Sequence, residues 1–157
     1  MKSQQLETNI FHYTATISAC AKGRRWQPAL HFLHTMTEAE VIPNSIAYSA
    51  AISACEKGEQ WQVALQLLRQ MPLLKLVPDV ITYTAAISAC EKGGQWPFAL
   101  SLLVSMPKIS IFPNVITYNA AISACEKGAI WRCSLHLFDG ILQAEMVSKR
   151  CLFHLPF

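Results

Sequence analysis

The nonapeptide AAISACEKG occurs unchanged at residues 50–58, 85–93 and 120–128, and a diverged copy, ATISACAKG, occupies residues 15–23. Each copy begins 35 residues after the previous one. Two residue types outside the nonapeptide keep the same interval: the tryptophans Trp26, Trp61, Trp96 and Trp131, and the tyrosines Tyr13, Tyr48, Tyr83 and Tyr118. The cysteines within it are Cys20, Cys55, Cys90 and Cys125. A fixed period of this length predicts a tandem array in which one supersecondary unit stacks on the next.

The composition is that of a folded chain with a small positive charge. Of the 157 residues, 52% are hydrophobic and 15% are charged, which allows a core and argues against wholesale disorder. The formal net charge of +3 permits an anionic partner but does not require one.

Cysteine usage indicates reduced thiols. Four of the six cysteines share one repeat position, and equivalent helices of stacked repeats lie about 8–10 Å apart. A disulfide needs Cα atoms about 4.4–6.8 Å apart, so these cysteines are expected to be small buried residues in a reducing compartment. No cysteine or histidine pair has the spacing of a zinc site.

The sequence contains no candidate membrane span, since its uncharged runs are too short. Its first residues, MKSQQLETN, have no apolar signal core and are too short and too poor in arginine for a transit peptide.

Each repeat predicts two helices, as the third repeat illustrates. Asp79 can cap the first helix, whose apolar stripe covers residues 83–90, and Gly93 is expected at its C′ position. A second amphipathic helix is expected to open near Trp96 and to end at Pro107.

The predicted organisation has four repeats between two short flanks. These segments are an extension at 1–9, expected to be a polar cap or a loose end, repeats at 10–44, 45–79, 80–114 and 115–149, and an apolar tail at 150–157. The fourth repeat is degenerate after Trp131, and Gly140 is expected to weaken its second helix. The tail either covers the end of the stack or reflects an array cut short, and we favour the second interpretation.

The unit V-I-T-Y-N-A-A-I-S-A-C-E-K-G, followed by Trp, Ala-Leu, Met and Pro-Asp or Pro-Asn, resembles the pentatricopeptide repeat (PPR) family, P type, over residues 10–139. The repeated sequence ISACEKG resembles that of organellar PPR arrays of algae and related protists. The resemblance implies an all-α, right-handed α-solenoid of about four helix-turn-helix repeats. No appended catalytic domain follows the repeats in this sequence.

The resemblance also implies recognition of single-stranded RNA, one base per repeat. The readers would be the fifth and last residues of each repeat: Thr14 with Asn44, Ser49 with Asp79, Thr84 with Asn114, and Asn119 with Lys149. The implied preference is A-G-A from 5′ to 3′, and Lys149 puts the pyrimidine suggested by Asn119 in doubt. Bases would be wedged by Phe11, Ile46, Ile81 and Ile116, and phosphates would be contacted by Lys22, Lys57, Lys92 and Lys127.

Each of these residues also has a purely structural interpretation. The last residues of the repeats can be helix N-caps, the lysines can be partners of the helix dipole, and the isoleucines can pack between repeats. The tryptophans lie in an apolar stripe and are expected in the core rather than in a base-stacking ladder. His31 and His34 are expected on the surface, and Glu56, Glu91 and Glu126 are expected to form a solvated edge.

The favoured function is an RNA-binding adaptor of a chloroplast or mitochondrion, acting in RNA processing, stabilisation or translation. No catalytic constellation, cofactor or metal site is visible in the sequence, so the chain is not expected to be an enzyme. The alternative is a helical solenoid that binds a peptide or protein. Because four bases specify a site that recurs too often to be unique, a longer array, a multimer or a partner protein is expected.

Overall fold

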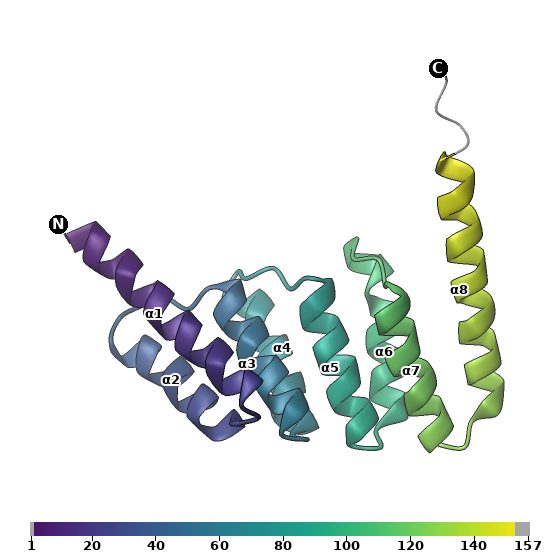
Figure 1. The fold of residues 1–157 in the computed structure, drawn as a ribbon, viewed down its shortest axis with the longest axis horizontal. Helices are drawn as coiled ribbons and strands as arrows, with labels where there is room; N and C mark the ends of the chain where they lie inside the picture. Colours follow the sequence, from purple (N-terminus) through teal and green to yellow (C-terminus); the bar gives the residue numbers. More distant parts are fainter. Residues whose placement is uncertain (1, 153–157) are drawn as a thin grey trace.

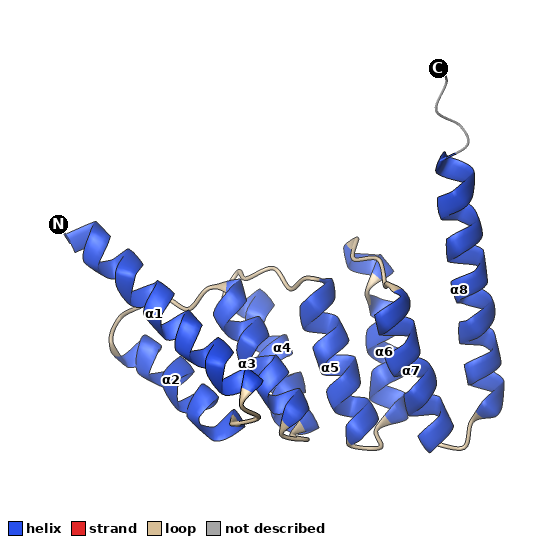
Figure 2. Ribbon diagram, in the orientation of Figure 1, coloured by secondary structure: helices blue, strands red, loops and turns tan. Residues whose placement is uncertain are grey.

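The computed structural model describes the backbone of residues 2–152 and the side chains of residues 10–143, and the regular structure of this part is entirely helical (Figures 1 and 2). The helices are α1 (Lys2–Lys22), α2 (Trp26–Glu38), α3 (Ser45–Lys57), α4 (Trp61–Leu73), α5 (Val80–Lys92), α6 (Trp96–Ser105), the short 3₁₀ helix η1 (Pro107–Ile109), α7 (Val115–Lys127) and α8 (Trp131–Leu152). The expected all-α repeat array is therefore confirmed. Among the described helices, none is long and apolar enough to cross a membrane.

The helices form pairs that stack in one row, with the two chain ends at opposite ends of the row (Figure 1). The odd-numbered helices α1, α3, α5 and α7 contact one another in succession. Each even-numbered helix from α2 to α6 packs against its own partner and against the first helix of the next pair. The odd-numbered helices therefore form a continuous layer, and the even-numbered helices fill the angle behind it.

Side-chain caps begin three of the four odd-numbered helices. The Oδ1 atoms of Asn44, Asp79 and Asn114 accept hydrogen bonds from the backbone nitrogens three residues later, at 2.8, 2.8 and 2.9 Å. These side chains satisfy amide groups that the first helical turn leaves without partners. The N-cap interpretation of the last repeat residue is confirmed for these three repeats.

The glycine after each odd-numbered helix differs from the expected left-handed C′ residue. Gly93 has φ −78°, and the left-handed conformation falls on the next residue, Gly94, with φ +67°. The other three helices turn in the same way at non-glycine residues, Arg24, Glu59 and Ala129, with φ between 55° and 59°. Backbone freedom therefore does not explain the glycine of the repeated nonapeptide.

Close packing of a tryptophan explains that glycine. A Cβ atom placed on Gly93 would lie 2.3 Å from Cδ1 of Trp61, and one on Gly128 would lie 2.4 Å from Cδ1 of Trp96. Gly58 meets Trp26 in the same way. The first three tryptophans are thus packed between successive pairs, as the core interpretation expected, whereas Trp131 is 64% exposed because no further pair packs on it in the described part of the chain.

The core contains the repeated cysteines. Cys55, Cys90 and Cys125 are fully buried, and the five described cysteines, which include Cys20 and Cys133, are all free thiols. Burial raises the pKa of Cys55 to about 12 and that of Cys90 to about 11, because a thiolate loses its hydration in this environment.

Both end helices differ from the expectation. Residues 2–9 continue α1 rather than forming a loose end, since most of them are adequate helix formers. Helix α8 runs without a break through Gly140, because one glycine costs only about 1 kcal/mol and no proline lies between Gly140 and Leu152. Residues 153–157 and the side chains of 144–152 lie outside the described part. Both interpretations of the tail at 150–157 therefore concern residues outside it.

Candidate functional site

The fifth and last residues of a repeat meet in a cavity at the boundary between successive pairs. Between α1 and α3, a cavity of about 400 Å³ is lined by Thr14, Asn44, Phe11 and Ile46. The boundary between α5 and α7 has a cavity of about 270 Å³, whose lining includes Thr84, Asn114, Ile81 and Ile116. The fold thus brings two predicted base-reading residues and two predicted wedges together at each of these boundaries.

The four predicted wedges lie in solvent rather than in the packing between pairs. Phe11 is 73% exposed, and Ile46, Ile81 and Ile116 are between 64% and 67% exposed. Large apolar side chains repeated along one surface at this exposure are a typical feature of an interaction surface. Of the two interpretations for the isoleucines, inter-repeat packing does not fit this exposure.

The caps decide which polar group remains for a ligand. Because Oδ1 of Asn44 and Asn114 is engaged by a backbone amide, the other end of each side chain is an NH₂ donor. Asp79 Oδ1 accepts from both the backbone nitrogen and Oγ1 of Thr82, at 2.8 and 2.6 Å, so its second oxygen remains as an acceptor. The boundaries closed by asparagine therefore offer a donor, and the one closed by aspartate offers an acceptor.

The hydroxyl groups of the two cavities differ in their hydrogen bonding. Oγ1 of Thr14 is buried and has no partner among the described residues. Oγ1 of Thr84 lies 2.7 Å from Val80 O and 2.7 Å from Oγ1 of Thr117. The difference arises because Ala47 occupies the place in α3 that Thr117 occupies in α7. Thr117 was not among the residues predicted to form the site, although Thr82 stands at the same repeat position.

Two of the four predicted phosphate-binding lysines are already paired with carboxylates. Nζ of Lys92 lies 2.5 Å from Oε1 of Glu56, and Nζ of Lys127 lies 2.6 Å from Oε1 of Glu91. Each pair joins one repeat to the next, and Glu91 also accepts from Oγ of Ser123 at 3.1 Å. The two glutamate side chains are only 15–17% exposed, so the expected solvated acidic edge is wrong for both.

Lys22 and Lys57 have no carboxylate partner among the described side chains. Ala21 occupies the glutamate position that would face Lys57. The cationic track is therefore uneven, with two free charges towards the N-terminal end of the row. The sequence signal for these pairs was a glutamate followed 36 residues later by a lysine. The first repeat lacks this signal because it has alanine in place of the glutamate.

The other predicted base-reading residues, Ser49, Asp79 and Asn119, also stand at the fifth or last position of a repeat. Ser49 is half-buried and Asn119 is exposed. Lys149, the expected partner of Asn119, falls outside the described side chains. His31 and His34 are exposed, and His34 lies 3.4 Å from Glu38. Within the described residues, no group of three or more histidine, cysteine, aspartate or glutamate side chains could hold a metal ion.

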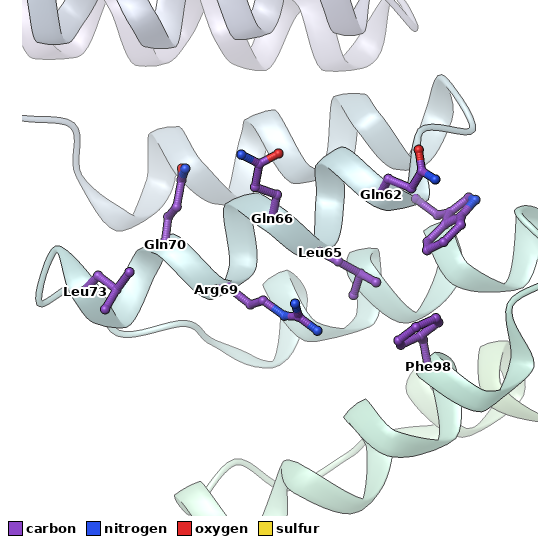
Figure 3. A pocket seen from close by; sticks show the side chains of 8 residues that line it. Gln62, Leu65, Gln66, Arg69, Gln70, Leu73 and Phe98 are labelled. Atoms are coloured by element: carbon purple, nitrogen blue, oxygen red, sulfur yellow. The ribbon is translucent and has the colours of Figure 1, made fainter.

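A third hollow lies over α4, in the even-numbered layer, with a volume of about 310 Å³ (Figure 3). The rings of Trp61 and Phe98 stack with centroids 5.7 Å apart. Figure 3 shows Phe98 at one end of the hollow and Arg69 along it. Its lining does not recur with the repeat, since His34, Val104 and Asp139 stand at the positions equivalent to Arg69. This hollow therefore lacks the periodicity of the boundary cavities.

Comparison with known proteins relates the chain to one family. The sequence matches the PPR repeat family over residues 43–92 and 78–127, and it matches the pentatricopeptide repeat domain over residues 1–57. Among curated proteins, none matches.

Solved structures of pentatricopeptide repeat proteins have the same fold as this chain. The PPR domain of Arabidopsis thaliana protein-only RNase P 1, determined in complex with tRNA, has a TM-score of 0.78 at 15% identity, over 87% of this chain and 72% of that one. The pentatricopeptide repeat protein PPR10 from maize has a TM-score of 0.62 at 25% identity, over 70% of this chain and 16% of the maize chain.

Proposed function

Because the chain belongs to the pentatricopeptide repeat family, we propose that it binds single-stranded RNA and reads one base at each boundary between helix pairs. The observation that carries this proposal is the composition of the boundary cavities. Each combines two exposed apolar side chains, which suit the two faces of a base, with a hydroxyl and a cap side chain, which suit its edge.

The cap chemistry supports the preference A-G-A. Adenine presents an acceptor, N1, in the middle of its Watson–Crick edge, which matches the NH₂ group that Asn44 and Asn114 leave free. Guanine presents donors at N1 and N2, which match the free carboxylate oxygen of Asp79. With the strand running 5′ to 3′ from the N-terminal to the C-terminal repeat, the three boundaries read A, G and A. Asn119 adds a pyrimidine only if the side chain of Lys149 permits it.

The cellular role follows from occupation of an RNA site rather than from chemistry. The chain is proposed to be a P-type adaptor that protects, remodels or delivers an organellar RNA, in a chloroplast or a mitochondrion. Thr14 supports the binding role, because a buried hydroxyl without a partner costs about 1–3 kcal/mol until a ligand satisfies it.

Fluorescence-anisotropy titration tests the proposal with two U-rich RNAs, one carrying AGA and the other carrying CUC at the same place. Wild-type protein is expected to prefer AGA, and Asn114→Asp is expected to move the preference towards AGG. The substitution keeps the helix cap, because Asp79 already caps α5 in the same way. A change in base preference therefore reports on the free group and not on loss of structure.

Two outcomes would contradict the proposal. Equal weak binding to both RNAs would leave only a nonspecific cationic surface. No binding by a protein that remains fully helical would favour the alternative, a solenoid that binds a peptide or protein.

A further inference from the structure

The last helix pair has an open cavity between α7 and α8. It has a volume of about 580 Å³, and its lining includes Ile122, Glu126, Trp131 and Leu135. Trp131 is 64% exposed and Leu135 is 57% exposed. Leu65, the residue equivalent to Leu135 two repeats earlier, is buried. The cavity is therefore apolar, with a single carboxylate at its edge.

Helix α7 fills the corresponding place at the preceding boundary. There, Glu91 forms an ion pair with Lys127 and accepts a hydrogen bond from Ser123, and Trp96 packs on Gly128 so closely that a Cβ atom would lie 2.4 Å from the ring. The lysine and serine of α7 and the glycine that follows it thus contact a glutamate and a tryptophan of the preceding pair. The same lysine and glycine contacts join α5 to the pair before it.

The outward face of α1 has all three of these groups without their partners. Lys22 has no carboxylate partner among the described side chains, and Ser18 stands at the position of Ser123. A Cβ atom on Gly23 would meet only ordinary contacts, the nearest at 3.5 Å, because no tryptophan covers this glycine. Ala19 is exposed, although its equivalents Ala54, Ala89 and Ala124 are at most 1% exposed.

We propose that α1 of a second copy of this chain docks into the α7–α8 cavity and continues the stack from one molecule to the next. Lys22 and Ser18 of one copy then bind Glu126 of the other, and Gly23 receives Trp131. The contact repeats the geometry of the internal boundaries, and the charges at the two ends are complementary. Docking uses the same kind of interface that the chain already forms between its own helix pairs.

The lengths of the end helices are compatible with this docking. Helix α1 has 21 residues and α8 has 22, whereas α3, α5 and α7 have 13 each. The additional turns of α1 and α8 leave the row on the same side (Figure 1). In the docked arrangement these turns run antiparallel beside each other, because α1 takes the place that follows α8.

The interface joins two different surfaces, so each copy has one end of each kind. Such heterologous contacts form open chains or closed rings rather than isolated symmetric dimers. End-to-end stacking would also lengthen the row of boundary cavities, although the association itself does not depend on RNA binding.

Sedimentation velocity without RNA tests the proposal over about a hundredfold range of protein concentration. The mean mass of the wild type is expected to rise with concentration and to exceed that of a dimer. Gly23→Ala is expected to abolish the increase, because the methyl group fits the free chain but would overlap the incoming Trp131. Glu126→Lys is expected to weaken association about tenfold or more, and the double variant Lys22→Glu/Glu126→Lys is expected to restore it.

A mixing experiment distinguishes this contact from a symmetric one. Gly23→Ala retains an intact α7–α8 cavity, and Trp131→Ala retains an intact α1 face, so each alone is expected to be monomeric. An equimolar mixture is expected to form dimers and nothing larger. Circular dichroism of each variant confirms that it is folded before it is mixed.

Three results would overturn the proposal. The first is a wild-type protein that remains monomeric throughout the concentration range, as expected if the chain's own tail covers the cavity. The second is association that persists unchanged in both Gly23→Ala and Trp131→Ala. The third is a mixture of these two variants, both folded, that stays monomeric while the wild type associates.

Discussion

Replacing Glu56 by glutamine should strengthen RNA binding, although it breaks an ion pair. Glu56 holds Lys92 at 2.5 Å and lines the cavity that contains Thr84 and Asn114. In the wild type, a phosphate approaching Lys92 meets a charge that is already neutralised, beside a carboxylate that repels it. Glutamine removes the repulsion and leaves Lys92 as a free cation.

The size of the effect follows from counterion release. Each phosphate contact on a single strand contributes about −0.7 to the slope of log K against log salt. In the monomer, where Lys22 and Lys57 are both free, the wild-type slope should be about −1.4, rather than the value near −3 expected from four free lysines. Freeing Lys92 should steepen it to about −2.1 and raise affinity about fourfold at 0.15 M salt, or about 0.8 kcal/mol.

Anisotropy titrations of the AGA probe at several salt concentrations measure both quantities. Glu38→Gln is the matched control, since it makes the same change in net charge on α2, where Glu38 is exposed and away from the boundary cavities. The control should leave the slope unchanged. Loss of the Glu56–Lys92 pair should lower the free energy of unfolding by no more than about 1 kcal/mol, because the lysine is partly exposed.

Either of two results would refute this reasoning. A wild-type slope near −3 would mean that the paired lysines leave their glutamates to bind phosphate. An unchanged slope and affinity in Glu56→Gln would mean that Lys92 does not lie on the path of the RNA.

Other predictions concern stability. Gly93→Ala should lower the free energy of unfolding by about 1–3 kcal/mol in urea titrations, because its methyl group overlaps a tryptophan ring, whereas Gly23→Ala in dilute solution should change it by less than about 0.5 kcal/mol. Asn114→Ala should cost about 0.5–2 kcal/mol through loss of the cap, and an unchanged urea midpoint would contradict that role. Burial raises the pKa of the Cys55 thiol to about 12 and that of Cys90 to about 11 from an ordinary value of 9.0, so the folded state binds more protons than the unfolded state above about pH 9. These thiols should therefore leave the urea midpoint unchanged just below pH 9 and lower it as the pH rises towards 11–12, and a midpoint that does not fall there would contradict their burial.

The periodicity was sufficient to predict the array and most of its local structure. An apolar stripe with helical spacing, a cap residue after proline and a tryptophan opening the second helix are local signals, which act within a few turns of chain. They correctly predicted the cap role of Asn114 and the burial of Cys90. The positions of the boundary cavities also follow from the repeat, since equivalent residues in a regular stack must recur along one face.

Contacts between successive repeats could not be predicted in the same way, because they depend on how far one pair is rotated and shifted against the next. That geometry makes Gly93 a seat for Trp61 rather than a left-handed turn residue, and it places Glu56 against Lys92 of the following pair. The sequence therefore determined which residues recur along the stack. Tertiary packing decided which of the recurring groups neutralise one another and which remain free to bind, because burial and pairing depend on neighbours that lie 32 to 36 residues away.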